Sequence, residues 1–542
     1  MDSTYRNIFK WGDKREEHIA PRMKELIKDK FGYSDDDFRE KRLPGLEQVM
    51  VEKRPALKPR QLDFIRSVVG DDDILTDDYS RARFSCGKFY GELLDLRLGR
   101  VACPPDAVVA PESHEEVEKL ISYCSSEHIP VIPVGGQSSV TGALKAPEGG
   151  IALDLTKHLN RVLRISTVNK TVTVQAGISG PSLEAELNSN GYTCGHFPQS
   201  FEYSTAGGWI AARGAGQAST GYGKIEDMVV ALRAVTPAGV IETKDYPRTA
   251  QGWDLFRLFI GSEGTLGVIT EITLRIYNYN PRDTASAAFI FRSFGQAVEA
   301  MRKVMQSEYG KPHLFRISDP DETDIAFRTG GSHNSMSDKL LRRLGFRPGE
   351  RCLMFVTVEG ERDYNHFVLK KIKMTVRKGG GMFIGTGAVK KWLDQRYSSA
   401  YIRDPLMDLG IMTDTLETAV TWESLMKVWS SARAYVSRRP KTVFMVHISH
   451  VYENGANLYF TFLSPMEQGN ERDDFAAFHL GLVDTIVENG GSLSHHHGVG
   501  RVLAPWMESH LGESSMKALK AIKRHFDPEN IMNPGGTLGL TQ

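Results

Sequence analysis

Three consecutive histidines, His495, His496 and His497, lie between glycines in the stretch GSLSHHHGVG (residues 491–500). Imidazole titrates near neutral pH, so such a run could bind a metal ion or transfer protons. Successive residues of an extended segment point to opposite sides, which leaves His495 and His497 facing one way. Two imidazoles fall short of the three protein ligands that a zinc site needs. No CxxC pair, HExxH motif or carboxylate cluster stands nearby, so we expect no metal unless distant segments complete the ligand set.

Two arginines and one tyrosine are further candidates for chemistry. Arg316 in LFRISDPD and Arg403 in AYIRDPLMD could bind an anion, because a guanidinium group donates two parallel hydrogen bonds to a phosphate or carboxylate. Each also has acidic neighbours, so a structural salt bridge is the alternative. Tyr459 lies in the alternating segment NLYFTFL, which places it on one face of a strand. With a pKa near 10, a tyrosine needs a nearby histidine or arginine to transfer protons near neutrality.

Three loops rich in glycine and small residues could line an elongated anionic ligand. The first, PVGGQSSVTG (133–142), follows a strand, and its backbone N–H groups and Ser138 and Ser139 hydroxyls suit a pyrophosphate. The others are PQSFEYSTAGGWIAARGAGQASTGYGKIEDMV (198–229) and GSEGTLGVIT (261–270). So many glycines cost chain entropy unless the backbone must approach a ligand closely. The first loop alone would fit an ordinary turn equally well, and it matches neither GxGxxG nor a Walker motif.

The predicted elements place these motifs on loops. A strand in PDAVVAP, a helix that begins with a capping box at Ser113-His114-Glu115-Glu116, and the strand IPVIPV lead into the first glycine loop. Strands in IALDL, KTVTVQAGI, DMVVALRAVTP and GTLGVITEITLRIY surround the other two. From about residue 281, apolar strands mix with amphipathic helices. The helix DDFAAFHLGLVDTIVE ends in Asn489-Gly490-Gly491, so the histidines lie on the loop that follows it.

Length and composition restrict the class of protein. A chain of 542 residues is too long for one core and predicts two to four domains. Lys+Arg 67 balances Asp+Glu 67, so no overall field would attract nucleic acid. Five scattered cysteines argue against a disulfide framework and indicate a reducing compartment. The charged start is unlike a secretory signal, and no stretch has the roughly 20 apolar residues of a membrane span. We therefore expect a cytoplasmic protein.

The motifs together resemble the FAD-binding flavoenzymes of the vanillyl-alcohol oxidase / p-cresol methylhydroxylase (VAO/PCMH) family, and within it the alkyldihydroxyacetonephosphate synthases. PVGGQSS is similar to the family's PIGGGTS loop, and PQSFEYSTAGGW with the following residues 212–215 to its PDSLEFSTVGGW…TRAS block. SEGTLGVIT, FRISD, AYIRD, LYFTF and SLSHHHGVG extend the resemblance over roughly residues 100–535.

The resemblance implies an α+β fold with four parts. An N-terminal helical region (1–100) precedes a two-part FAD-binding domain of the PCMH type (101–280). A cap domain built on an antiparallel sheet (281–490) binds the substrate, and a C-terminal segment (491–542) returns to the FAD site.

It also implies the roles of individual residues. Tyr459, Arg316, His495, His496 and His497 are expected to be catalytic, with the imidazoles beside the flavin, and Arg403 to bind substrate. FAD is expected to be non-covalent, since its pyrophosphate loop contains no histidine or cysteine. The residues expected to bind it are Pro133, Val134, Gly135, Gly136, Gln137, Ser138, Ser139, Pro198, Gln199, Ser200, Phe201, Glu202, Tyr203, Ser204, Ala212, Arg213, Gly214, Ala215, Glu263, Gly264, Thr265, Leu266, Gly267, Val268 and Ile269.

The reaction that the resemblance implies has no net redox change. The acyl group of acyl-dihydroxyacetone phosphate would be exchanged for a fatty alcohol through an adduct at flavin N5, which forms an ether lipid precursor. Such lipid-like substrates call for an apolar tunnel and contact with a membrane surface, and we expect a homodimer.

Two departures keep alternatives open. Gln137 replaces a glycine of the family loop, and the ending DPENIMNPGG resembles FAD-linked D-lactate and glycolate dehydrogenases. The alternative is an FAD-dependent dehydrogenase or oxidase of a 2-hydroxy acid or other alcohol, with Arg403 holding a carboxylate and a histidine removing the hydroxyl proton. A histidine-metal enzyme or a binding protein without cofactor is the third hypothesis.

Overall fold

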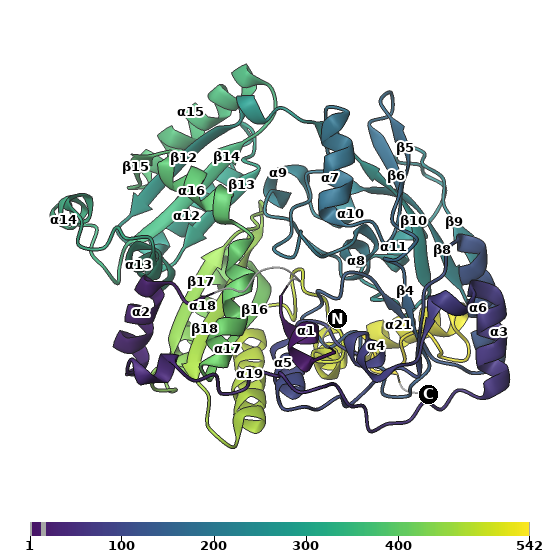
Figure 1. Ribbon diagram of the computed structural model, residues 1–542. Coiled ribbons are helices and arrows are strands. Elements are labelled where there is room, and N and C mark those ends of the chain that lie inside the picture. The colour runs from purple at the N-terminus through teal and green to yellow at the C-terminus, as the bar shows by residue number, and fades with distance from the viewer. Residues whose placement is uncertain (1–2, 12–17, 541–542) are drawn as a thin grey trace.

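The computed structural model describes residues 3–11 and 18–540, which form two α/β lobes that lie side by side (Figure 1). The strands between residues 74 and 278 belong to the first lobe, and those between residues 285 and 465 form the sheet of the second. The three glycine loops belong to the first lobe and a large antiparallel sheet to the second, so the site between them draws on both.

The first lobe contains two larger sheets, in which β2, β3, β4, β6, β8 and β10 lie in segments predicted as strands, whereas β1, β5 and β9 were not predicted. One has the order β1-β2-β4-β3, with β2, β4 and β3 parallel, and the other is antiparallel in the order β5-β6-β10-β8-β9. The strands are β1 (Ile74–Leu75), β2 (Ala107–Val109), β3 (Val131–Val134), β4 (Ile151–Asp154), β5 (Val162–Ser166), β6 (Thr171–Gln175), β8 (Val229–Thr236), β9 (Gly239–Glu242) and β10 (Val268–Arg275). The first glycine loop leaves the end of β3, and the third leads into β10.

Helices and small elements complete this lobe. Helix α6 (His114–Ser126) begins where the Ser113 hydroxyl accepts the N–H of Glu116, as the capping box predicts, and it packs Val117 and Leu120 onto the parallel strands. The remaining elements are α7 (Gly180–Ser189), α8 (Ala206–Ala211), α9 (Ser219–Tyr222), α10 (Ile225–Met228), α11 (Phe256–Phe259), and the paired strands β7 (Tyr192–Thr193) and β11 (Tyr277–Asn278).

The second lobe is built on a seven-stranded antiparallel sheet in the order β15-β12-β14-β13-β17-β18-β16. Its strands are β12 (Ala285–Phe291), β13 (Leu314–Ser318), β14 (Cys352–Val358), β15 (Met382–Gly385), β16 (Ile411–Thr421), β17 (Val443–Ile448) and β18 (Gly455–Pro465). Alternate side chains face opposite ways, so Phe289 enters the large core on one face while Ile290 packs with Phe327 and Val389 on the other.

Helices cover both faces of this sheet. The large core includes side chains of α12 (Phe294–Met305), α15 (Arg362–Lys378), α18 (Trp422–Val436) and α19 (Glu471–Glu488). The other helices of the lobe are α13 (Pro320–Thr329), α14 (Met336–Arg343), α16 (Gly387–Gln395) and α17 (Arg403–Asp408). Helix α19 ends at Glu488 with Asn489 as its C-cap, so the histidine run follows it on a loop, as predicted.

The first hundred residues are distributed over both lobes. Their helices are α1 (Tyr5–Phe9), α2 (Pro21–Phe31), α3 (Pro59–Val69), α4 (Asp78–Arg83) and α5 (Tyr90–Arg97). Helix α2 contacts α13 of the second lobe, whereas α3 contacts α6 of the first. Every helix of the described chain falls short of the length and apolar character that crossing a bilayer requires.

The C-terminal segment returns to the first lobe. After α20 (Met507–Leu511) and α21 (Glu513–Phe526), the chain runs beside β3, where the N–H of Val131 donates to the carbonyl of Ile531 and the N–H of Asn533 donates back to Val131. The histidine loop is thereby brought from the second lobe towards the glycine loops.

Candidate active site

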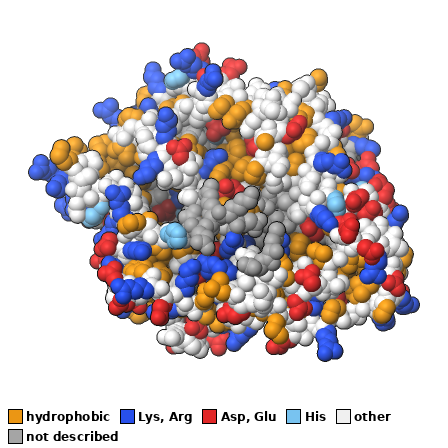
Figure 2. Space-filling view, viewed as in Figure 1, with side chains coloured by type: hydrophobic (Ala, Val, Ile, Leu, Met, Phe, Trp, Pro, Cys, Tyr) orange, Lys and Arg blue, Asp and Glu red, His pale blue; other side chains and the backbone are white. Residues whose placement is uncertain are grey.

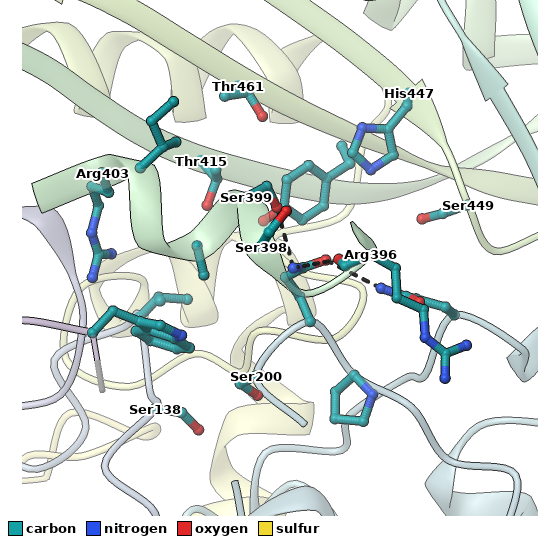
Figure 3. A pocket seen from close by; sticks show the side chains of 18 of the residues that line it. Ser138, Ser200, Arg396, Ser398, Ser399, Arg403, Thr415, His447, Ser449 and Thr461 are labelled. Carbon is teal, nitrogen blue, oxygen red and sulfur yellow. Dashed lines mark hydrogen bonds between the residues drawn. The ribbon is translucent and has the colours of Figure 1, made fainter. Parts of the chain in front are cut away.

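A cavity of about 1440 Å³ lies between the lobes. All three glycine loops line it, together with the faces of β16, β17 and β18 and the histidine loop. Figure 3 shows Arg403, Thr415 and His447 of the second lobe across the cavity from Ser138 and Ser200 of the first. Single ligand pockets have volumes of about 300–1,000 Å³, so this cavity has room for a cofactor and a substrate together.

Most of the residues expected to bind FAD line this cavity. Those that lie outside its lining are Phe201, Glu202, Tyr203, Arg213, Thr265, Leu266 and Val268. Tyr203 and Glu202 contact the hydroxyl of Tyr401, and Arg213 pairs with Glu226, so these side chains hold neighbouring loops in place.

Close packing explains why the loops need glycine. A β-carbon on Gly136 would collide with the carbonyl of Tyr203, and one on Gly135 would press on the Thr205 hydroxyl. Gln137, which stands where the family loop has glycine, adopts a φ of 55°, a left-handed conformation that favours glycine. Its side-chain amide nitrogen is buried without a hydrogen-bond partner among the described residues.

Tyr459 lies at the centre of the cavity wall on the second lobe. It is opposite Glu417 on β16 and His447 on β17, and the His447 ring stacks on it with 4.7 Å between centroids. The His497 ring approaches edge-on at 5.5 Å. Burial raises the pKa of Tyr459 to about 12, so it is a neutral phenol near pH 7 and needs these neighbours to exchange a proton.

A buried carboxylate, Glu417, fixes the histidine loop. Its oxygens accept the Ser494 hydroxyl at 2.5 Å and the backbone N–H groups of His495, His496 and His497 at 2.6, 3.2 and 3.0 Å. Burial alone would raise the pKa of Glu417, but its interaction with His496, which includes a side-chain hydrogen bond, holds it well below its ordinary value. The charged carboxylate therefore gathers three successive N–H groups and curls the loop.

This curl makes the predicted pairing of the histidines wrong. His496 and His497 line the cavity, with their ring centroids 4.6 Å apart, whereas His495 shares a hydrogen bond of 2.7 Å with the Tyr452 hydroxyl. Alternation applies to extended backbone, and a segment wound around one carboxylate is not extended. Burial lowers the pKa of His497 to about 4, so its imidazole is neutral near pH 7 and can accept a proton.

Arg316 is held by a carboxylate. It pairs with Glu322, which also accepts a hydrogen bond of 3.0 Å from His447 Nδ1. Burial alone would raise the pKa of Glu322, but Arg316 and His447 lower it to about 2. The nearer acidic residues, Asp319 and Asp321, both pair with Arg433. The salt bridge of Arg316, which was the alternative to a catalytic role, therefore forms with a residue six positions along the chain.

No carboxylate forms an ion pair with Arg403 among residues 3–11 and 18–540. Its Nη1 donates to the carbonyl of Lys88 at 2.8 Å, while Nε and Nη2 are buried with no hydrogen-bond partner within the described ranges. Its neighbour Asp404 pairs with Arg97 at 3.3 Å and accepts the backbone N–H of Trp11. Because buried donors are normally satisfied, the free edge of Arg403 at the cavity indicates a site for an anion.

Comparison with known proteins agrees with this site. The family model described as the FAD binding domain matches residues 105–244, and the model for the C-terminal domain of FAD linked oxidases matches residues 280–537. Alkyldihydroxyacetonephosphate synthase of Dictyostelium discoideum is 32% identical over 528 residues, which cover 92% of this chain and 86% of the relative. This chain belongs to the alkyldihydroxyacetonephosphate synthase family.

Solved structures support the same assignment. A structure of alkyldihydroxyacetonephosphate synthase superimposes with a TM-score of 0.83 at 30% identity, and covers 98% of this chain and 97% of that one. p-Cresol methylhydroxylase with substrate bound matches at a TM-score of 0.69 and 16% identity, which shows the fold. The α+β fold of the PCMH type and the dependence on FAD, both inferred from the sequence, are confirmed.

The cavity of this synthase-family chain fits FAD. Its first-lobe wall offers backbone loops with little side-chain bulk, as a long cofactor requires. His196 lies there with both ring nitrogens buried and without partners among residues 3–11 and 18–540. Burial lowers the pKa of His196 to about 3, which makes it a neutral donor and acceptor. These unpaired groups, with that of Gln137, suit the hydrogen-bonding edges of a bound flavin nucleotide.

Several residues of the site were not predicted from the sequence. His196, Glu322, Glu417, His447 and His450 are buried beside the cavity or line it. Only His196 had a local signal, because it directly precedes the second glycine loop. The other four reach the site through strand register and helix packing, which single-sequence patterns do not specify.

An apolar branch extends the cavity away from the glycine loops. Side chains of α2, α13, α14 and β14 line this part, namely Met23, Leu26, Ile27, Ile325, Leu340, Leu341, Leu344, Leu353 and Phe355. The lining of one cavity therefore includes both Tyr459 and apolar residues of α14.

Proposed function

We propose that this chain exchanges the acyl group of acyl-dihydroxyacetone phosphate for a fatty alcohol, as an alkylglycerone-phosphate synthase. One observation carries the proposal: a single cavity joins an arginine with free buried donors, Arg403, to an apolar branch that suits a long aliphatic chain. The anionic end and the aliphatic tail of such a substrate have different requirements, and the two parts of the cavity meet both of them.

The residues around Tyr459 suit proton transfer at the carbon between these ends. Arg403 would bind the phosphate through its free Nε and Nη2 and so orient the substrate. Tyr459 and the neutral His497, in ring contact, would hold and move the proton of the carbon whose substituent is exchanged. Bound FAD supplies the electron-accepting chemistry at that carbon, and the second-lobe wall excludes water from it.

We also propose that α14 makes peripheral contact with a membrane, from which the lipid-like substrate would enter. Met336, Leu340 and Leu344 are exposed by 87%, 57% and 46% of their surfaces, and the last two also border the apolar branch. Figure 2 shows basic and apolar side chains together on this protruding helix, where Lys339, Arg342 and Arg343 lie. Apolar insertion combined with attraction to anionic lipid is the usual basis of interfacial binding.

Vesicle sedimentation tests this contact. Binding to vesicles with anionic lipid should fall at least about fivefold in Leu340→Ser/Leu344→Ser, with thermal stability within about 0.5 kcal/mol of the parent. Phe367→Ser is the matched control, because Phe367 lies on the outer face of α15, is 51% exposed and does not line the cavity. Equal binding by all three proteins would remove α14 from the proposal.

Oxidation of a 2-hydroxy acid is the competing reaction, because Arg403 would hold a carboxylate equally well. The two separate in one comparison on flavin-loaded protein. Incorporation of labelled hexadecanol into palmitoyl-dihydroxyacetone phosphate, without bleaching of the flavin, supports the synthase. Anaerobic bleaching by D-lactate or glycolate, without incorporation, would replace it with a dehydrogenase.

Two further proposals concern the linkage of the flavin and the oligomeric state. We propose that FAD is bound without a covalent link, which predicts that acid precipitation releases all of the flavin into the supernatant. We also propose a homodimer, which light scattering of the purified protein would confirm or replace by another mass.

A further inference from the structure

Three imidazoles from two segments that are distant in the sequence lie close together, two of them on the histidine loop. His450 precedes β18, whereas His495 and His496 follow α19, and one ring nitrogen from each lies within 4.8 Å of the others. The ring of His450 stacks on His495 at 5.0 Å and meets His496 edge-on at 5.0 Å. The third ligand that the sequence left open is therefore supplied by the fold.

His450 has an unused ring nitrogen. The residue is only 4% exposed, and its Nδ1 is buried with no hydrogen-bond partner among the described residues. Because buried polar atoms are normally paired, this nitrogen is available to a ligand that the cluster holds.

Neighbouring polar groups orient the rings of this cluster. His495 Nε2 bonds to the Tyr452 hydroxyl at 2.7 Å, which leaves Nδ1 on the inner side, 2.9 Å from His496 Nδ1. Metal-binding histidines typically engage their second nitrogen in this way, which fixes the ring orientation. The Glu417 carboxylate, 3.5 Å from His496 Nδ1, offsets the nearby Lys224 ammonium, which donates to the carbonyl of His495.

We propose that His450, His495 and His496 bind one divalent cation of the zinc type. Three imidazoles form the set expected of a zinc ion with an open fourth position, and His450 and His496 line the cavity, so that position faces it. Tetrahedral ligands at zinc–nitrogen distances of about 2.0–2.1 Å lie roughly 3.3 Å apart, so His495 and His496 need separate by only a few tenths of an ångström. Tyr459 and His497 stay outside the ligand set.

Metal uptake tests this site without requiring turnover. Flavin-loaded protein is freed of metal with a chelator and titrated with Zn²⁺ by calorimetry, then with Co²⁺, whose visible bands report tetrahedral coordination. We expect one equivalent per chain with tetrahedral cobalt bands. His450→Gln and His495→Gln should each weaken binding at least tenfold. Tyr452→Phe should weaken it by about 10–100-fold, the range found when outer partners of metal ligands are removed.

A second cluster in the same chain gives the matched control. Asp73, Glu112 and His158 also bring three ligand atoms within 4.8 Å, but Asp73 is already paired with Lys157 and His158. His158→Gln should leave the high-affinity binding unchanged. Absence of stoichiometric uptake, or equal affinity in the parent, His450→Gln and His495→Gln, would show a hydrogen-bonded imidazole cluster only. Bound flavin and thermal midpoint verify that each variant is folded, and the two ligand variants lie on different segments, so either one decides the result.

Discussion

The two arginines of the cavity form a natural comparison, because the sequence suggested each for the same reason and their surroundings differ. The Arg316 corner, with Glu322 and His447, is closed, because the guanidinium group is already paired with a carboxylate. Arg316 and His447 together lower the pKa of that carboxylate. The Arg403 corner is open, with a carbonyl as its only described hydrogen-bond acceptor and two partnerless donors. The carboxylates that the fold places beside an arginine therefore decide whether it forms a structural salt bridge or is available to a ligand.

The largest expected effect concerns His497, whose ring contacts Tyr459 on the cavity wall. His497→Ala should lower turnover about 1000-fold, since a positioned acid or base contributes about 10²–10⁴ in rate. Flavin content should stay unchanged, because Glu417 holds the loop through the backbone N–H of residue 497, which alanine keeps. Turnover and the flavin-to-protein ratio are measured together. Loss of bound flavin would instead give His497 a structural role.

Arg403→Met should lower kcat/KM about 100-fold or more. Loss of charge-assisted hydrogen bonds to an anion costs about 2–5 kcal/mol, at about 1.4 kcal/mol for each tenfold. Thermal stability should be kept or should rise, because the variant removes a buried charge without a carboxylate. Steady-state kinetics and a melting curve check both parts. A marked drop in melting temperature would contradict the open-corner interpretation.

Arg316→Met should show the opposite balance. It strands the buried Glu322 carboxylate, so the free energy of unfolding should fall by about 3 kcal/mol. The double variant Arg316→Met/Glu322→Gln should recover part of this loss, since no unpaired charge is left. Denaturant unfolding of the two variants and the parent measures the difference. Equal stability of the single and double variants would show that the pair does not act as a unit.

The smallest effect is a dependence on pH. The folded-state pKa of Glu322 is about 2, below its ordinary value of 4.5, so its contribution to stability is complete above pH 4.5 and is lost as pH falls towards 2. The parent should therefore lose more stability than Glu322→Gln between about pH 5 and pH 3. Unfolding midpoints at both values test this. Parallel changes in the two proteins would mean that the closed corner does not titrate.

Local features of the site could be predicted from the sequence, whereas features that depend on distant residues could not. The glycine loops are local features: glycine content marked all three positions, and the strand before the first loop led to the prediction of a pyrophosphate there. The loop position of the histidines followed from the end of α19. Which imidazoles face the cavity did not follow, because that depends on Glu417, 78 residues before His495 and brought there by the register of β16 with β18.

The same limit applies to partners of charged groups. Asp404 adjoins Arg403 in sequence, yet it pairs with Arg97, which is 307 positions away. Glu322 reaches Arg316 because α13 begins directly after β13 and turns its first residues back over the strand. Pairings of this kind result from packing and are not visible in residue spacing alone.

The hydrogen bonds between β3 and residues 531–533 have a consequence for biosynthesis. Val131 leaves the ribosome roughly 400 residues before the backbone that becomes its neighbour. During translation the first sheet therefore has an unsatisfied edge directly before the first glycine loop, and the histidine loop is also still missing. The nascent chain cannot build its complete cofactor site domain by domain, so stable loading with flavin must wait until synthesis has passed Asn533.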